Sequence, residues 1–249
     1  MRALFRDHTH YILIAAAAAV LLPAAAEAQF AFGAYLGKSL TFDGNVRLEQ
    51  PGGTDLTFHD VGWYDESWVN PKYYGFRLSY WKRNSPRWGL VLDFTHAKIY
   101  AELDATVRVT GNREGETVDT REFLGDTFSE LAMSHGHNTL TINGFYRWIS
   151  DTGSGGARRL TPYVGFGAGI ALPHVEVRTG DSVTEEYQLA GPTLQALGGL
   201  DYRLGWGFSI FGEYRLNYAS LSANLTGGGS LKLTPWTNHI SIGVTFNFP

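Results

Sequence analysis

Histidine and carboxylate side chains are the residues of this chain whose chemistry suits a metal ion. The segment Ser134-His135-Gly136-His137-Asn138 carries two imidazoles two positions apart, and a third, His239, lies near the C-terminal end. Neutral imidazole and nearby carboxylates are typical ligands of Fe, Cu, Mn and Zn. Joined by Asp60, Glu130 or Glu176, these three histidines would supply three or four ligands, which predicts a metal site.

Strands are the elements that must position these residues, because apolar and polar residues alternate with a period of two from Gln29 onward. In residues 74–80, large apolar side chains occupy the even positions, and Gly, Arg and Ser occupy the odd ones. The same alternation recurs often enough to predict eight strands, at residues 30–42, 74–80, 90–94, 140–143, 164–170, 194–198, 208–217 and 240–248.

The composition of the polar face favours a membrane barrel over a soluble sandwich. That face carries many glycines together with Arg77, Asp93, Asn143, Glu213 and Arg215. Such a mixture is typical of the lumen of a small barrel, where charged side chains pair and glycine leaves them room. We therefore predict an all-β fold, an eight-stranded antiparallel transmembrane β-barrel with long extracellular loops. A soluble periplasmic sandwich or a lipocalin-like barrel is the alternative.

The connections between the predicted strands support this topology. Short links at 82–87, 150–159 and 205 alternate with long ones at about 43–71, 101–134, 176–186 and 220–235. Outer-membrane barrels have short periplasmic turns, long extracellular loops and aromatic girdles. Trp81, Trp88, Trp148 and Trp206 flank the short links and are expected in the periplasmic girdle. In the first long loop, two alternating runs around Pro51-Gly52-Gly53 predict an additional surface hairpin.

Strand direction then predicts the height and the side of each histidine. If Gln29 starts in the periplasm, all six histidines after it lie at the extracellular end: His59, His96, His135, His137, His174 and His239. By alternation, His135, His137 and His239 point into the lumen, whereas His96 and His174 point outward at the height of the lipid head groups. The alternative is that these are interfacial histidines that hydrogen-bond loop backbone or lipid phosphate.

Five short strings resemble one family, the alphaproteobacterial outer-membrane proteins called lipid A oxidases. The resemblance covers about residues 30–248 and implies dioxygen-dependent oxidation of the proximal glucosamine of lipid A to 2-aminogluconate. The strings are Asp55-Leu56-Thr57-Phe58-His59-Asp60, Asp93-Phe94-Thr95-His96-Ala97-Lys98, Ser134-His135-Gly136-His137-Asn138, Pro173-His174-Val175-Glu176 and Thr237-Asn238-His239.

Oxidising a sugar lactol removes two electrons, so we expect a redox-active metal ion, Fe, Cu or Mn, as the cofactor. The expected catalytic residues are His135, His137 and His239, with His96 and His174 as further metal ligands. Four residues are expected to hydrogen-bond these ligands or to contact the substrate: His59, Asp60, Asn138 and Glu176.

Three other functions are compatible with such a barrel. A non-catalytic surface barrel, acting as an adhesin, a stabiliser or an anchor, needs only the fold. A lipid A deacylase would need Ser beside His, as in His239-Ile240-Ser241, but alternation turns both of these side chains into the lumen. A narrow porin is disfavoured, because the lumen is crowded with charged side chains.

The composition excludes two kinds of function, and the two ends of the chain predict export and membrane insertion. With no Cys and a net charge of −4, the sequence offers neither thiol chemistry nor a basic nucleic-acid surface. Residues 1–28, which contain Arg2, Arg6, an apolar run and Ala26-Glu27-Ala28, form an expected cleaved export signal before a barrel domain at 29–249. The final strand resembles a barrel assembly signal, although Pro249 follows the last Phe. The expected partners are the barrel assembly machinery, outer-membrane lipid and lipid A or lipopolysaccharide.

Overall fold

The computed structural model describes residues 28–82, 84–149 and 159–248. The expected export signal lies outside these residues apart from Ala28, and Pro249 lies outside them as well. A search of the described segments for a helix able to cross a membrane finds none of sufficient length and apolar character.

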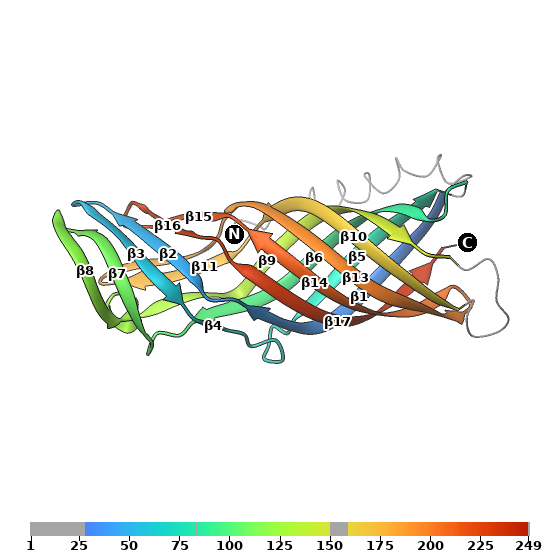
Figure 1. Ribbon diagram of the computed structural model, residues 1–249, viewed down its shortest axis with the longest axis horizontal. Coiled ribbons are helices and arrows are strands. Elements are labelled where there is room, and N and C mark those ends of the chain that lie inside the picture. The colour runs from blue at the N-terminus through green and yellow to red at the C-terminus, as the bar shows by residue number, and fades with distance from the viewer. Residues whose placement is uncertain (1–27, 83, 150–158, 249) are drawn as a thin grey trace, which may run out of the picture.

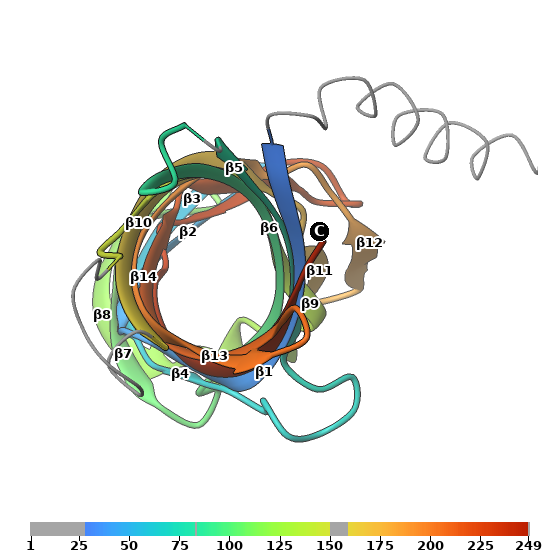
Figure 2. The same ribbon diagram turned by 90° about the vertical axis from the view of Figure 1, so that its right-hand side faces the viewer.

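Eight long strands close into one antiparallel barrel, which confirms the predicted fold (Figures 1 and 2). Each strand pairs with its two neighbours around the ring, and β17 returns to β1. In ring order the strands are β1 (Ala28–Thr41), β5 (Tyr74–Lys82), β6 (Trp88–Ala101), β9 (Glu130–Arg147), β10 (Leu160–Ala171), β13 (Gly191–Gly205), β14 (Phe208–Ala219) and β17 (Trp236–Asn247).

The pairing register shows how strongly the strands tilt. Followed from Tyr35 through β5, β6, β9 and β10, the paired residues lead to Gly191 of β13. Followed the other way through β17 and β14, they lead to Asp201, ten positions along the same strand. An eight-stranded barrel with tilted, staggered strands has an interior just wide enough for side chains to fill.

The outer surface of the barrel is apolar, as a lipid-facing surface must be. The exposed fraction reaches 64% for Phe166 and 68% for both Ile240 and Ile242. Trp88 and Trp148 are also exposed at the end with the short turns, which we call the inner end. Together with barrel closure, this apolar wall and aromatic girdle are the features of a barrel from the outer membrane of a Gram-negative bacterium.

Trp81 corrects one expectation about the aromatic girdle. Its side chain is only 7% exposed and packs inside the lumen against Phe145, with the Arg147 guanidinium 3.8 Å above its ring. Trp81 therefore belongs to the barrel interior and not to the lipid-facing girdle.

Four buried charged side chains form a network across the middle of the lumen, which we call the charge lattice: Arg77, Asp93, Glu213 and Arg215. Arg77 donates two hydrogen bonds of 2.9 Å to the Glu213 carboxylate and one of 3.1 Å to Asp93. Arg215 bridges the same two carboxylates, at 2.7 Å from Glu213 and 3.0 Å from Asp93. Two positive and two negative charges thus balance in a space from which water is excluded.

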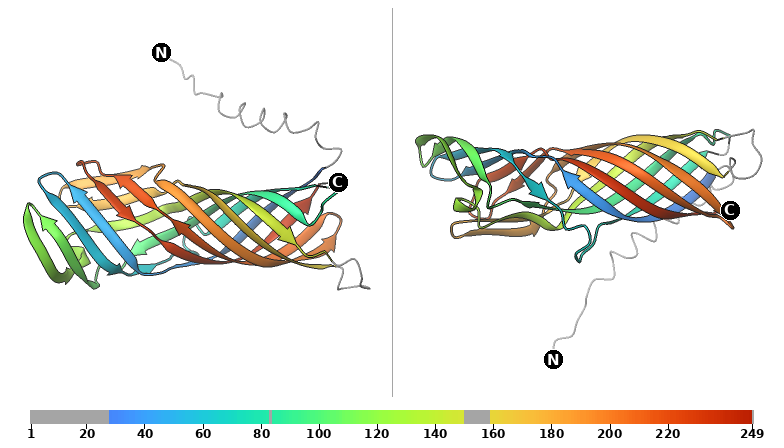
Figure 3. Two further views of the ribbon diagram at one scale, coloured as in Figure 1. Left: turned by 45° about the horizontal axis from the view of Figure 1, so that its top comes forward. Right: turned by 60° about the horizontal axis from the view of Figure 1, so that its bottom comes forward.

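The long outer loops are folded and extend the barrel well beyond its apolar wall (Figures 1 and 3). The predicted first-loop hairpin is present as β2 and β3, and it joins a second sheet and not the barrel. This six-stranded sheet has the order β15 (Leu221–Asn224), β16 (Ser230–Leu233), β2 (Gly44–Gln50), β3 (Thr54–Val61), β7 (Thr106–Arg113) and β8 (Glu116–Phe123). The barrel sheet is itself extended by β4 (Trp63–Tyr64), β11 (His174–Thr179) and β12 (Ser182–Tyr187), and a short 3-10 turn, η2, spans Leu124–Asp126.

An apolar core fills this outer extension. It combines side chains of the second sheet, such as Leu48 and Phe58, with Ile99 of β6, Met133 of β9 and Val175 of β11, all at most 4% exposed. The interior therefore changes from polar in the barrel to apolar above it. This core fixes which side chains of β9 and β11 are left to face outward.

Candidate functional site

A large bulge in β9 sets the position of the candidate site. Ala97 of β6 pairs with His137 and Ile99 pairs with Met133, so Ser134, His135 and Gly136 together face a single residue of β6. Gly136 has a φ of +125°, and a Cβ there would lie 2.4 Å from the Asn138 side chain. Only glycine fits this backbone position, so the bulge depends on Gly136.

His135 is turned out of the lumen by this bulge, which makes the prediction of its direction wrong. The bulge adds an even number of residues, so Met133 and His137 keep their inward direction on either side of it. Simple alternation holds for those two residues and fails for the inserted ones. The side chain of His135 is 58% exposed.

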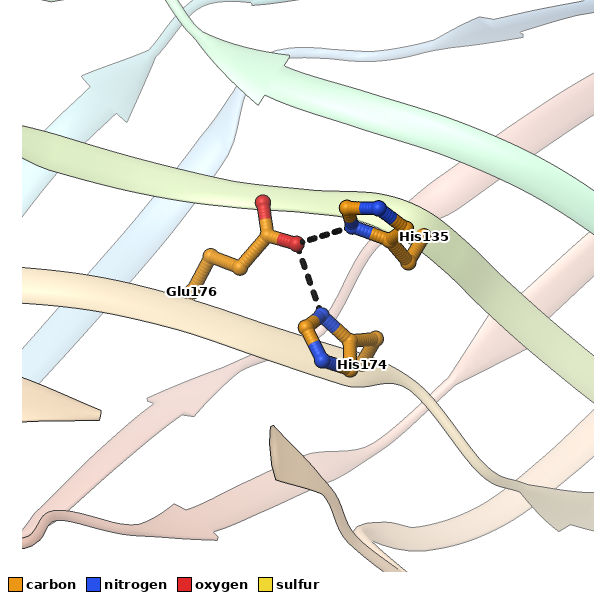
Figure 4. A group of neighbouring side chains, drawn as sticks. All are labelled: His135, His174 and Glu176. Atoms are coloured by element: carbon orange, nitrogen blue, oxygen red, sulfur yellow. Dashed lines mark hydrogen bonds and ion pairs between the residues drawn. The ribbon is translucent and has the colours of Figure 1, made fainter. Parts of the chain in front are cut away.

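His135, His174 and Glu176 form a group in which all three ligand atoms lie within 4.8 Å of one another (Figure 4). The Nδ1 atoms of His135 and His174 lie 2.8 and 2.7 Å from the same oxygen, Oε1, of Glu176. Ser134 donates a hydrogen bond of 2.7 Å to that oxygen. We call His135, His174 and Glu176 the wall triad.

The wall triad faces away from the barrel interior. On β11, Val175 and Val177 enter the apolar core, so the alternating residues His174 and Glu176 point to the opposite side. The outward direction predicted for His174 is therefore observed. Tyr187 of β12 packs edge-on against the His174 ring, with ring centroids 4.6 Å apart, and is itself 61% exposed. The triad is thus approached from outside the barrel wall.

The electrostatics of Glu176 favour its ionised form. Its side chain is only 4% exposed, and burial alone would raise the pKa of its carboxyl group. Hydrogen bonds from Ser134, His135 and His174 outweigh that effect and hold the pKa of Glu176 below its usual value. A negative carboxylate beside two imidazoles is the charge state that a divalent metal ion requires.

His96 lies on the same outer side, as predicted, but is covered. Its ring stacks on Tyr74 at a centroid distance of 4.7 Å, and its Nδ1 lies 2.8 Å from the Asn138 amide oxygen. Asn138 was expected to hydrogen-bond a histidine ligand, and it contacts His96 in this way. His96 is 3% exposed, and it adds no ligand atom to the wall triad.

His137 and His239 lie inside the lumen, as alternation predicts, at 2% and 4% exposure. Within the described residues, both ring nitrogens of His137 lack a hydrogen-bond partner, and so does the Nδ1 of His239. The ring of Tyr73 lies 5.6 Å from that of His239. The predicted set of His135, His137 and His239 is therefore divided between the two sides of the barrel wall.

His59 and Asp60 lie apart from both histidine groups, in the second sheet. His59 bonds through Nε2 to the Thr110 hydroxyl at 2.8 Å, and the backbone N–H of Asp60 donates to the Asn45 side chain. Asp60 is exposed and has a φ of +53°. Neither residue adds a ligand atom to the wall triad.

Three neighbours of the wall triad were missed from the sequence: Glu66, Lys98 and Tyr100. Tyr100 lies close enough to Glu66 for the carboxylate charge to act on its hydroxyl group, and Lys98 pairs with Glu66 at 3.5 Å while being only 1% exposed. Alternation could have placed Lys98 and Tyr100 on the side of His96, since all three are even-numbered residues of β6. Glu66 comes from an irregular segment, for which the sequence offered no periodic signal.

Comparisons with known proteins assign the chain to no family. No protein-family model matches the chain, and no curated protein matches it. Among solved structures it is similar to Neisserial surface protein A, at 13% identity and a TM-score of 0.41, with 89% of this chain and 97% of that one covered. It is also similar to Ail of Yersinia pestis, at 14% identity and a TM-score of 0.34, with 89% of this chain and 98% of that one covered. A third similar structure is the outer membrane protease OmpT of Escherichia coli, at 9% identity and a TM-score of 0.40, with 88% of this chain and 97% of that one covered.

Proposed function

We propose that this outer-membrane barrel binds a redox-active metal ion at the wall triad and oxidises the proximal glucosamine of lipid A to 2-aminogluconate with dioxygen. One observation carries the proposal: two imidazoles and a buried carboxylate converge at the outer end, on the side of the wall that faces away from the lumen. Lipid A lies in the outer leaflet around such a barrel, so its sugars would meet this side of the wall.

The ligand types of the wall triad favour iron among the candidate metals. Two histidines and one carboxylate on one face, with positions left open for substrate and dioxygen, are typical of non-haem Fe(II) oxygenases. A bound metal would replace the hydrogen bonds that now join His135 and His174 to Glu176, so the two rings would have to shift slightly. His135 is exposed and can make that adjustment.

The proposed reaction balances in two steps. The hydroxyl-bearing anomeric carbon loses two electrons and two protons to become a lactone, and dioxygen takes them up to become hydrogen peroxide. Water then opens the lactone to the acid, so the lipid gains one oxygen atom. A redox metal would supply the electron path, while Glu176 and the two histidines would hold it beside the lipid.

His137 and His239 form a second candidate set inside the lumen, so an experiment must distinguish this set from the wall triad. We propose purifying the barrel in detergent, loading it with Fe(II), and incubating it with lipid A that bears a free anomeric hydroxyl, under air and under nitrogen. An air-dependent mass gain of one oxygen is expected. His174→Ala and Glu176→Gln should remove bound metal and activity, whereas His137→Ala should keep both, with His59→Ala as the surface control.

The outcomes separate the possibilities. Loss of metal in His137→Ala together with retention in His174→Ala would move the site into the lumen. If the metal-loaded parent converts no lipid A, a non-catalytic surface barrel becomes the better function. That alternative, an adhesin, stabiliser or anchor, is favoured by the second sheet, which holds a folded surface above the membrane.

The proposed function also requires delivery to the outer membrane. We propose export by the signal at residues 1–28 and insertion by the barrel assembly machinery, which would bind the last strand. The alternating residues of β17 that lead to Phe246 and Phe248 support this. Truncation after Thr245 should abolish insertion while leaving export intact, which fractionation of cells would show.

A further inference from the structure

A second site opens at the inner end of the barrel, on the opposite side of the charge lattice from the histidines. The lumen there contains a cavity of about 330 Å³. The inner end of the barrel faces the viewer in Figure 2. Arg147 and Arg203 reach it from β9 and β13, Asp201 lies beside them, and Trp81 and Phe145 form an aromatic wall.

Arg147 is held in place without an acidic partner. Its Nε donates a hydrogen bond of 2.6 Å to the Pro86 carbonyl oxygen, and its guanidinium stacks on Trp81. These two contacts orient the group, and its terminal N–H donors make no hydrogen bond with any residue that the structure describes. No carboxylate of the described residues lies within ion-pair distance of it.

Arg203 is freer still. Its backbone N–H bonds to Arg159, but its side chain makes no hydrogen bond or ion pair with any described residue. The charges of Arg147, Arg203 and Asp201 are close enough to interact. Asp201 therefore offsets part of the positive charge without pairing directly with either arginine.

The inner cavity differs from the charge lattice because its charges do not balance. In the charge lattice, Arg77 and Arg215 are matched by Asp93 and Glu213. Two guanidinium groups against one carboxylate leave the inner cavity with one net positive charge. A guanidinium group with donors that are not engaged in an ion pair is well suited to bind a phosphate or carboxylate group in a bidentate manner.

We propose that this inner cavity is a binding site for a small anion that carries a phosphate or carboxylate group and enters from the periplasmic side. Arg147 and Arg203 bind the anionic group, and Trp81 and Phe145 pack against the rest of the ligand. The volume lies at the lower end of the range for small-molecule sites, which limits the ligand to a head group or a small metabolite. The charge lattice forms the floor of the site and blocks passage further outward.

Titration calorimetry of the full barrel, refolded in an uncharged detergent at low salt, tests this site. Three probes distinguish the sources of the anion: inorganic phosphate for the free ion, glycerol 3-phosphate for a lipid head group, and N-acetylglutamate for a cell-wall carboxylate. Binding of at least one probe is expected, and Arg203→Gln should weaken it about tenfold because one charge-assisted contact is lost. Arg147→Gln should weaken it similarly, whereas Arg108→Gln in the second sheet should not change it.

A charge-conserving variant and a folding assay serve as controls. Arg203 is exposed, so its variants should fold, and Arg203→Lys should retain part of the affinity because it keeps the charge. Migration of unheated and heated samples on a gel checks that each variant is a folded barrel. The proposal is overturned if none of the three probes binds with a Kd of about 1 mM or tighter, or if both glutamine variants bind like the parent.

Discussion

Replacing Glu213 by Ala should be among the most destabilising single changes in the barrel. The Glu213 side chain is fully buried and accepts four hydrogen bonds, two from Arg77 at 2.9 Å, one from Arg215 at 2.7 Å and one from Tyr163 at 2.9 Å. Without it, two arginines face Asp93 alone, and one positive charge is left unbalanced in the lumen. Breaking a buried ion pair in this way costs about 3 to 5 kcal/mol in unfolding free energy.

The assay is urea unfolding of the barrel folded into lipid vesicles, followed by tryptophan fluorescence. Asp119→Ala removes an ion pair with Arg108 on the exposed second sheet and is the matched control, for which no measurable change is expected. The double variant Arg77→Met/Glu213→Leu leaves Arg215 paired with Asp93, so it should recover part of the lost stability. If Glu213→Ala unfolds at the same urea concentration as the parent, the lattice does not stabilise the barrel.

The outer end of the barrel can be tested by a substitution, a pH series and proteolysis. Gly136→Ala should cost about 1 to 3 kcal/mol, because the new Cβ meets Asn138 and His96 at a positive φ, and it should weaken metal binding at the wall triad; unfolding and metal titration together check this. The carboxyl group of Glu176 has a lowered pKa in the folded protein, so its ionised form stabilises the fold at every pH above about 4.5, its pKa in the unfolded chain. This stabilisation is lost as the pH falls through the lowered pKa. Hydrogen exchange of β11 should therefore rise only below pH 4.5, and Glu176→Gln should show no such step. Protease added to intact cells should cut at the β7–β8 turn near Glu114 and Gly115, and cleavage only at residues 82–87 would reverse the assigned orientation.

Alternation predicted the barrel well because one physical constraint governs every spanning strand. A side chain facing lipid must be apolar, and one facing a narrow lumen must be small or must find a partner. Arg77, Glu213 and Arg215 could be placed inside from their position alone. Their hydrogen bonds could not be predicted, since these depend on the stagger between strands that are far apart in the sequence.

The candidate site was predicted less completely because it depends on a bulge. His135 follows the inward alternation of β9, and only the pairing with β6 shows that Ser134, His135 and Gly136 are inserted residues. A glycine between two histidines was the available signal, and its conformation could not be inferred from its type. The outer extension was predicted only in its first hairpin, β2 and β3. Residues 101–134 were expected to be one long link, whereas Val107 and Val109 on β7 enter a buried core.

The layers of side chains inside the barrel block the passage of ions through its lumen. An ion entering from the periplasm would meet the inner cavity first, then the charge lattice, then the buried layer of His137 and His239, and finally an apolar core where no polar group could replace its hydration shell. Reconstituted in a planar bilayer, the protein should therefore add no conductance. A cell can carry many copies of such a barrel without making its outer membrane leaky, and the proposed oxidation at the wall triad would need no exchange of solutes through the interior.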